Sequence, residues 1–231
     1  DDTRRIPVHI SDSRLPRVLE TRGRTITTVR QDQRLHDSVY LPTVGVTNYR
    51  SLGPKIKNVT TDILERNLSI VLSSETWQQD SNKKLKLDIE NMCELEGLEF
   101  ILCPRPSSKR GGGCAIIVNR RNFTVEKLVV DVPHKLEVVW CLVRPRQITK
   151  DMKYKEYIAC AYYSPPNYKK NGKLVQHIIS QMHSFLIKYP RAGFVCGGDR
   201  NKMETNLIEN ALPKCRQIVT KFTYKNKQIH D

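Results

Sequence analysis

Residues 194–201 read FVCGGDRN, and this stretch decides the fold prediction. Its apolar start is typical of a buried strand, which runs into two glycines, an acid, a base and an amide. We expect Gly197 and Gly198 to let the backbone turn sharply where the strand ends, so that Asp199 and Asn201 are presented beyond it. Because open α/β sheets usually build their sites at strand ends, the stretch predicts an α/β protein with a polar site in this place.

Other apolar strands end in side chains of similar kinds. Asn48 closes the run VGVTN, Glu75 follows LSIVLSS, and Tyr163 ends EYIACAYY. Each residue also has an ordinary explanation. Asn48 suits a turn, Glu75 a surface acid or helix cap, and Tyr163 an aromatic at a strand end, while Asp199 and Asn201 suit a simple loop.

Carboxylates, amides and a phenol together suit phosphodiester hydrolysis. Mg²⁺ prefers oxygen ligands and commonly takes one or two carboxylates while it keeps several waters. A carboxylate and an amide two residues apart can share one water, and a phenol can donate a hydrogen bond to a phosphate oxygen. The set therefore predicts a metal-dependent phosphodiesterase.

The sequence divides into an arm and one domain. Residues 1–38 are rich in Arg, Asp, Ser and Thr, which predicts a basic and polar linker or arm, mostly disordered. Residues 39–231 alternate helices and strands at both ends and carry a run of strands in the middle, which favours a mixed sheet or two packed sheets covered by helices. The predicted helices are 53–67, 82–96, 173–189 and 204–212, and the predicted strands are 44–48, 68–77, 98–103, 111–119, 123–130, 136–143, 156–163, 192–199 and 215–220.

The charge of the chain favours a polyanionic partner. The net charge is +15 at pH 7, and residues 1–38 contribute only +2 of it because their eight Arg are offset by six acids. The folded part therefore carries +13, which favours nucleic acid first and an anionic membrane surface second. A solvated basic surface without a partner is the alternative.

Cysteine usage and hydropathy bear on the compartment. The seven cysteines include no C-x-x-C pair, and Cys103, Cys114, Cys141, Cys160 and Cys196 lie in or beside predicted strands. Free, buried cysteines fit a reducing compartment, so we expect an intracellular protein, nuclear or cytoplasmic and not secreted. No apolar run approaches the roughly 18 residues that a membrane span needs, and the start of the chain has no signal-peptide pattern.

Several of these segments, in order, carry a resemblance to a known family. They are VTNYRSL (46–52), SSETW (73–77), GGGCAIIV (111–118), CAYYSPPN (160–167) and GGDRN (197–201). Over residues 42–231 the chain resembles the endonuclease/exonuclease/phosphatase fold, and most closely the endonuclease domain of non-LTR (LINE-type) retrotransposons. The resemblance implies a four-layer α/β sandwich of two packed mixed sheets flanked by helices. It also implies nicking of DNA with Mg²⁺, or Mn²⁺ as the alternative, by part of a longer polyprotein with a reverse transcriptase.

The resemblance also implies roles for particular residues. Glu75 would bind the metal with support from Asn48, Tyr163 would contact the scissile phosphate, and Asp199 would position or activate the attacking water with help from Asn201. Asp231 matches the acid that orients the family's catalytic histidine. The expected nucleic-acid contacts are Arg50, Lys109, Arg110, Arg200 and Thr223.

The sequence departs from the family pattern in three places. Arg200 replaces the usual Phe of the G-D-F-N motif, and Tyr224 stands where the family often has Arg. The Ser-Asp-His motif that ends the family's catalytic set does not follow Asp231, so we expect the domain to be incomplete at its C-terminus and to lack its last strand or strands. Two alternatives therefore stay open. One is a catalytically dead nucleic-acid-binding remnant, and the other is a different phosphodiesterase or phosphatase of the same fold.

Overall fold

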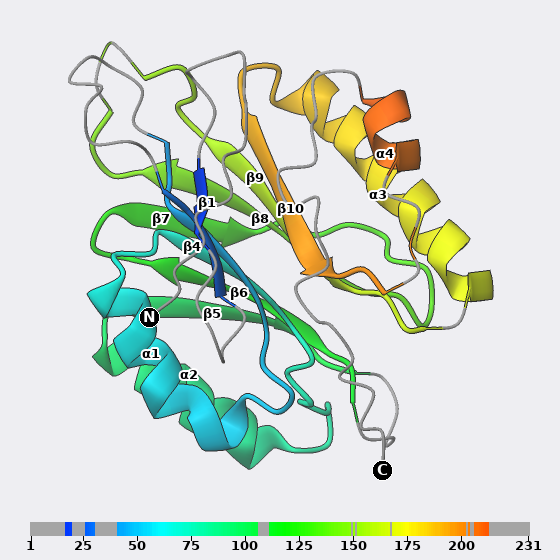
Figure 1. The fold of residues 1–231 in the computed structure, drawn as a ribbon. Coiled ribbons are helices and arrows are strands. Elements are labelled where there is room, and N and C mark those ends of the chain that lie inside the picture. Colours follow the sequence, from blue (N-terminus) through cyan, green and yellow to red (C-terminus); the bar gives the residue numbers. More distant parts are fainter. Residues whose placement is uncertain are drawn as a thin grey trace, which may run out of the picture.

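The computed structural model describes residues 17–19, 26–30, 41–105, 111–148, 150, 152–166, 168–201, 203 and 206–212. Their strands form two mixed sheets that pack face to face. Helices α1 and α2 cover the outer face of one sheet, and α3 and α4 lie against the other (Figure 1). The predicted four-layer α/β sandwich is confirmed in this arrangement of layers.

The first sheet brings the ends of several strands to one edge. Its order is β1 (Arg17–Leu19), β2 (Ile26–Arg30), β3 (Val44–Asn48), β4 (Ile70–Ser74), β6 (Cys114–Asn119) and β5 (Leu98–Cys103). Strands β3 and β4 are parallel, so Asn48 and Ser74 are register partners at their carboxyl ends. Strand β6 is antiparallel to β4, so its first residue, Cys114, lies beside Ser74.

The second sheet does the same with its own strands. Its order is β10 (Gly193–Asp199), β9 (Tyr157–Tyr163), β8 (Glu137–Pro145) and β7 (Phe123–Lys127). Strands β9 and β10 are parallel and end together, with Asp199 beside Tyr163. Strand β8 is antiparallel to β9, and its first residue, Glu137, is the partner of Tyr163 on the other side.

Helices α1 and α2 begin within three residues of the predicted positions, whereas α3 begins five residues before the predicted start at 173. A short 3-10 turn, η1 (Gly53–Lys55), leads into α1 (Ile56–Glu65), and its proline suits the first turn of a helix because that turn needs no backbone donor. Helix α2 (Lys83–Leu95) is capped by Asn82, whose Oδ1 accepts a hydrogen bond of 3.1 Å from the backbone N of Leu85. Helices α3 (Tyr168–Lys188) and α4 (Asn206–Ala211) complete the set of described helices, none of which is long and apolar enough to cross a membrane.

Three apolar cores fill the spaces between the four layers. The first joins α1 and α2 to the first sheet and includes Ile89 and Ile117. The second lies between the sheets and includes Leu72 and Val139. The third joins α3 to the second sheet around Trp140. Burial on both faces explains why the central strands β4, β6, β8 and β9 are mostly apolar and do not alternate with polar residues.

The two glycines of FVCGGDRN do not make a turn, and this part of the prediction is wrong. Both lie within β10, and neither has a positive φ. A Cβ at Gly197 would lie 3.0 Å from side-chain atoms of Val46 and Leu72 in the facing sheet, and a Cβ at Gly198 would overlap the backbone of Tyr162. The glycines therefore allow the two sheets, and neighbouring strands, to approach closely.

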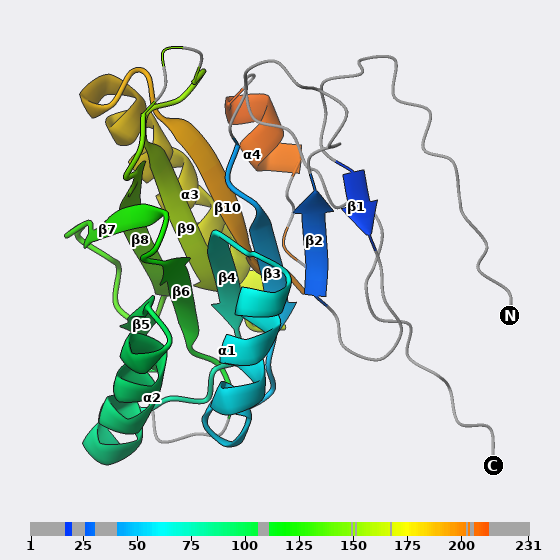
Figure 2. The same ribbon diagram turned by 90° about the vertical axis from the view of Figure 1, so that its left-hand side faces the viewer.

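Two segments of the predicted arm are strands. Strands β1 and β2 form a hairpin-like antiparallel pair, and β2 pairs with β3 at one edge of the first sheet (Figure 2). Their surroundings are polar and show no apolar periodicity, so the sequence pattern did not predict these short strands. The other residues of 1–38 lie outside the described residues, as does the strand predicted at 215–220, so those predictions stand as predictions.

The described cysteines are free thiols, and most of them are buried. Cys114, Cys141 and Cys160 are buried as expected, Cys103 is half-buried, and Cys196 is exposed. The prediction of burial is therefore wrong for Cys196, because β10 is the edge strand of the second sheet in the described part of the chain.

We expect the buried His177 to make the stability of the fold sensitive to acid. It is buried on α3 with its ring edge-on to Trp140, and burial lowers its pKa against the opposing charge of Asp131. Because the unfolded chain binds this proton more readily, the stability contributed by neutral His177 is present above its unfolded pKa of about 6.5 and is lost as the pH falls below it. When the pH falls from 7.5 to 5.5, we expect the free energy of unfolding, measured in urea, to decrease by about 1 kcal/mol less in His177→Gln than in the wild type. An equal decrease in both proteins would show that His177 does not cause the loss of stability at low pH.

Candidate active site

A hydrogen bond between two side chains joins the carboxyl end of β3 in the first sheet to the carboxyl end of β10 in the second. The Asn48 Nδ2 at the end of β3 donates to Oδ2 of Asp199 at the end of β10, at 3.0 Å. The backbone N of Arg50 donates to Oδ1 of Asn48 at 3.1 Å, which fixes the amide with its nitrogen toward Asp199. Residues 151 positions apart in the chain are thereby joined across the sandwich.

Asp199 is held by hydrogen bonds to both of its carboxylate oxygens. Its Oδ1 accepts a hydrogen bond of 3.2 Å from the backbone N of Asn201. Burial raises the pKa of the Asp199 carboxyl, and the charge of Glu75 raises it further, while the bonds from Asn201 and Asn48 and the charge of Arg50 act in the opposite direction. A carboxylate whose ionised form is disfavoured, yet which is held by donors, is suited to accept a proton.

Glu75 lies opposite Asp199 on the first sheet, just past the end of β4. Its carboxylate accepts hydrogen bonds from Nε1 of Trp77 and from the hydroxyl of Tyr163. Burial raises the pKa of Tyr163, and the bond and charge of Glu75 raise it further, so the phenol stays protonated at neutral pH. Tyr163 belongs to the second sheet, so this pair is a second link between the sheets.

Backbone conformations that side chains rarely adopt gather in this place. Arg50, Glu75, Trp77 and Asn201 have φ of +45°, +56°, +59° and +44°. Each such residue costs energy that the surrounding structure must offset. Here the loops are held by main-chain bonds, among them Ser51 N to the Glu75 carbonyl at 2.9 Å. Strained backbone conformations of this kind cluster at functional sites.

A buried network supports Asn201 from behind. The Asn201 Nδ2 donates to the carbonyl of Ser164 at 2.6 Å, and the backbone N of Ser164 donates to the carbonyl of Asp199 at 2.9 Å. The Ser164 hydroxyl in turn donates to Oδ1 of Asn171 on α3 at 2.7 Å. The loop after β10 is therefore tied to the loop after β9.

Asn201→Ala is expected to slow, about tenfold, the phosphodiester hydrolysis that the sequence predicts, since supporting partners of this kind are typically worth 10- to 100-fold. The substitution removes the bond to Ser164 and places Ala at a positive φ that asparagine tolerates better. The exposed Asn91 on α2 provides the matched control, Asn91→Ala, which should leave the rate unchanged. A rate for Asn201→Ala within twofold of the control would contradict this role.

A glycine turn forms one wall of the site. Gly111, Gly112 and Gly113 all have positive φ, and the carbonyls of Gly112 and Gly113 accept bonds from the backbone N of Trp77 at 2.9 Å and of Thr76 at 3.3 Å. A Cβ at Gly112 would lie 2.9 Å from Nη1 of Arg105. The turn therefore packs directly against the loop that follows Glu75.

The donor set at this edge fits a hard divalent cation. Glu75 is close enough to Asp199 for its charge to raise the pKa of Asp199, and Asn48 adds an amide beside Asp199. In the part of the chain that the structure describes, no group of three or more His, Cys, Asp and Glu side chains could hold a metal ion by itself. Two carboxylates with waters suit Mg²⁺, whereas a structural zinc site would need four protein ligands.

Six of the predicted site residues meet at this edge. They are Asn48, Arg50, Glu75, Tyr163, Asp199 and Asn201. Arg200 lies between Asp199 and Asn201, and its charge acts on the neighbouring Tyr162. Lys109, Arg110, Thr223 and Asp231 lie outside the described residues.

Three neighbours of the site were not predicted as part of it. Trp77 and Arg105 follow apolar strands, as the predicted residues do, so strand ends could have indicated them. Glu137 begins a strand, and its place at this edge follows from the antiparallel register of β8 with β9.

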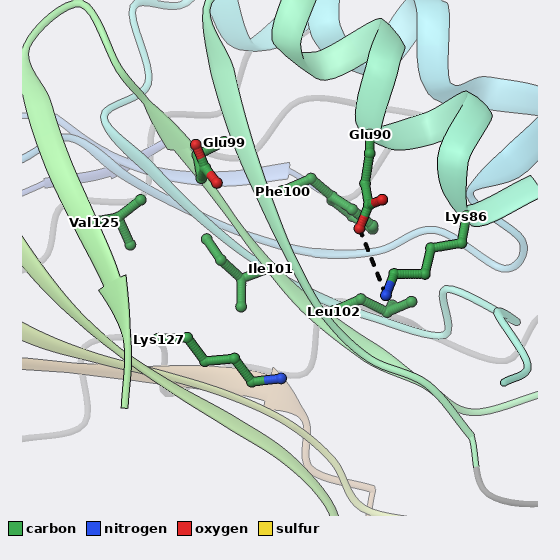
Figure 3. Close-up of a pocket in the computed structure, with 8 residues that line it drawn as sticks. All are labelled: Lys86, Glu90, Glu99, Phe100, Ile101, Leu102, Val125 and Lys127. Carbon is green, nitrogen blue, oxygen red and sulfur yellow. Dashed lines mark ion pairs between the residues drawn. The ribbon is translucent and has the colours of Figure 1, made fainter. Parts of the chain in front are cut away.

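A separate pocket lies between α2 and the edge strands of the two sheets. It is lined by Lys86, Glu90, Glu99, Phe100, Ile101, Leu102, Val125 and Lys127 (Figure 3). The 3.7 Å ion pair between Lys86 and Glu90 spans one turn of α2 at its rim. None of the predicted site residues lines it.

No known family model matches this chain, and neither does any curated protein sequence. Solved structures do match. A humanised TDP2 of D. rerio has a TM-score of 0.50 at 8% identity, with 73% of this chain and 65% of that chain covered. The human Nocturnin catalytic domain has a TM-score of 0.50 at 11% identity, with 75% and 69% covered. The endonuclease domain of the non-LTR retrotransposon TRAS1 has a TM-score of 0.43 at 15% identity, with 74% and 69% covered.

The chain spans less than half of some matched structures, with 42% of ANGEL2 covered. At these identities the likeness bears on the fold alone, and it rests on the two structures with the TM-score of 0.50. The chain therefore has the α/β sandwich fold of the endonuclease/exonuclease/phosphatase proteins.

Proposed function

We propose that this protein is a Mg²⁺-dependent phosphodiesterase that nicks DNA, as the endonuclease part of a retroelement polyprotein. The observation that carries the proposal is the hydrogen bond between Asn48 and Asp199, which joins the polar ends of the two sheets. Around that bond lie a second carboxylate, a protonated phenol and a second amide, which are groups suited to phosphodiester hydrolysis. The ordered motifs of the sequence support the retroelement assignment, and the net charge of +15 supports a nucleic-acid substrate.

In the proposed reaction, Asp199 accepts the proton of the attacking water. The bonds from Asn48 and Asn201 hold its carboxylate in one orientation, so the proton acceptor is fixed before substrate binds. The water oxygen forms a bond to phosphorus while the bond from phosphorus to the 3′ oxygen breaks, and that oxygen leaves as a 3′-hydroxyl with a proton from solvent. Asn201 holds Asp199 and the water on the side of β10.

Tyr163 and Glu75 act on the opposite side of the phosphate. The phenol of Tyr163 keeps its proton, and its single O–H can turn from Glu75 to donate a hydrogen bond to a phosphate oxygen. Glu75, with Asn48 beside it, would hold Mg²⁺, and bound there the ion would stabilise negative charge on the phosphate oxygens. The positively charged chain would track the DNA backbone.

The proposal is tested by nicking of supercoiled plasmid, with Mg²⁺ or with EDTA, by the wild type and by Glu75→Ala. We expect relaxed circles from the wild type in Mg²⁺ alone. Folded protein that binds DNA in a salt-dependent manner without nicking it would instead identify a nucleic-acid-binding protein. Cleavage of a lipid phosphodiester but not of DNA would identify another enzyme of the same fold.

A further inference from the structure

Arg105 is held at the site by its backbone and by its side chain. It follows the end of β5, and its backbone N donates to the carbonyl of Gln78 at 2.9 Å, in the loop that follows Glu75. Its Nε lies 3.8 Å from Oε1 of Glu137, and its side chain is 20% exposed. The Arg105 side chain is therefore largely shielded from water.

Glu137 is a buried anchor for this guanidinium. It is 7% exposed at the start of β8, beside Tyr163, and its Oε2 accepts a hydrogen bond from the backbone N of Gly113. A buried carboxylate must be paired or hydrogen-bonded to remain charged, and here it has both kinds of partner. The bond to the glycine turn fixes one oxygen, so the other is directed at Arg105.

The other end of the guanidinium faces the proposed metal-binding carboxylate. A Cβ at Gly111 would lie 3.3 Å from Nη1 of Arg105 and 3.7 Å from Oε2 of Glu75. The two groups therefore flank a position that has no side chain. The charge of Arg105 also acts on Tyr163, which places the cation within reach of the same phenol.

We propose that Arg105 binds a non-bridging oxygen of the scissile phosphate and that Glu137 is the positioning residue that holds it there. This inference rests on the proposed function. A guanidinium presents planar donors in a fixed fork that matches phosphate oxygens, and a group held in place loses no energy to reorganisation when charge develops. A side chain at Gly111 or Gly112 would crowd the guanidinium of Arg105, so the glycines let the turn pack against it without covering it.

The test compares single-turnover nicking at saturating Mg²⁺. We expect Arg105→Ala to lower the rate about 100-fold, as removal of one preorganised donor typically does. Arg105→Lys should recover part of the rate, and Glu137→Gln should lower it about tenfold through the loss of positioning. Arg120→Ala is the matched control, because Arg120 pairs with Glu94 and Glu99 at the opposite end of β6.

Chemical rescue separates a phosphate contact from a structural counter-ion. Arg105→Ala leaves Glu137 buried without its cation, so the double variant Arg105→Ala with Glu137→Gln is made as well, since it removes both charges. Guanidinium ion at a non-denaturing concentration should raise the nicking rate of Arg105→Ala at least tenfold and should not change the rate of the control. Wild-type rates in both Arg105 variants, or no rescue by guanidinium in a folded Arg105→Ala, would overturn the proposal.

Failure of the proposed function is recognised separately, because the wild type itself would then not nick. In that case binding of inorganic phosphate in the presence of Mg²⁺ decides the inference, as the shift in thermal midpoint of the full chain. Loss of that shift in Arg105→Ala, with the shift retained in Arg120→Ala, supports a phosphate site at Arg105. An equal shift in the wild type and Arg105→Ala, or no shift in the wild type, overturns it.

Discussion

Asp199→Asn is expected to reduce plasmid nicking about 1,000-fold while the protein remains folded, since general-base catalysis contributes about 100- to 10,000-fold. The amide keeps the shape of the side chain but cannot accept the proton of the attacking water. Its oxygen can still accept the bond from the backbone N of Asn201, while its NH2 group then faces Nδ2 of Asn48 and that hydrogen bond is lost. The measurement is the initial rate of nicking at saturating Mg²⁺, with circular dichroism to confirm the fold.

The matched control is Asp88→Asn, an acid-to-amide change on an exposed position of α2. It should nick at the wild-type rate. The pH dependence adds a second check. Because its pKa is raised, the Asp199 carboxyl loses its proton, and so becomes available as a base, at a higher pH than an ordinary aspartate does. Activity should therefore rise with pH on the acid side. Asp199→Asn with more than a tenth of the wild-type rate would contradict a proton-accepting role.

Glu75→Gln is expected to lower nicking by at least about 1,000-fold and to remove its response to Mg²⁺. The substitution removes the negative charge that a hard cation requires, while the size of the side chain is unchanged. It also replaces an acceptor of the Trp77 and Tyr163 hydrogen bonds with a weaker one, so the phenol and indole lose part of their orientation.

Thermal unfolding with and without Mg²⁺ tests the same substitution without reference to activity. A ligand that binds only the folded state raises its stability by an amount that grows with the logarithm of the ligand concentration above Kd, so Mg²⁺ should raise the midpoint of the wild type but not of Glu75→Gln. Glu90→Gln, at a partly exposed position of α2 that pairs with Lys86, is the control and should respond as the wild type does. Equal midpoint shifts in all three proteins would place the metal elsewhere.

The strand ends could be predicted from the sequence because each is a local pattern. Asn48, Glu75, Tyr163 and Asp199 each follow an apolar run, and the parallel pairs β3 with β4 and β9 with β10 carry those ends to the same edge. A short window of sequence is enough to find such a residue.

What the sequence could not give is set by contacts between distant segments. Gly197 reads as a turn residue, and its need for a missing side chain becomes visible only when Val46 and Leu72 of the other sheet are in place. Glu137 reads as the polar start of a strand, and only antiparallel pairing puts it beside Tyr163. Its partnership with Arg105 depends on two sheets that are joined by no sequence motif.

The most direct test of the account is polymerase extension from the nicks that the wild type makes in supercoiled plasmid with Mg²⁺. Hydrolysis with Asp199 as proton acceptor and the 3′ oxygen as leaving group predicts a 3′-hydroxyl, so labelled nucleotide should be incorporated at the nicks. Plasmid treated in EDTA, or with Asp199→Asn, should incorporate only the background amount. Nicks that no polymerase extends, or extension that is equal with Asp199→Asn, would contradict it.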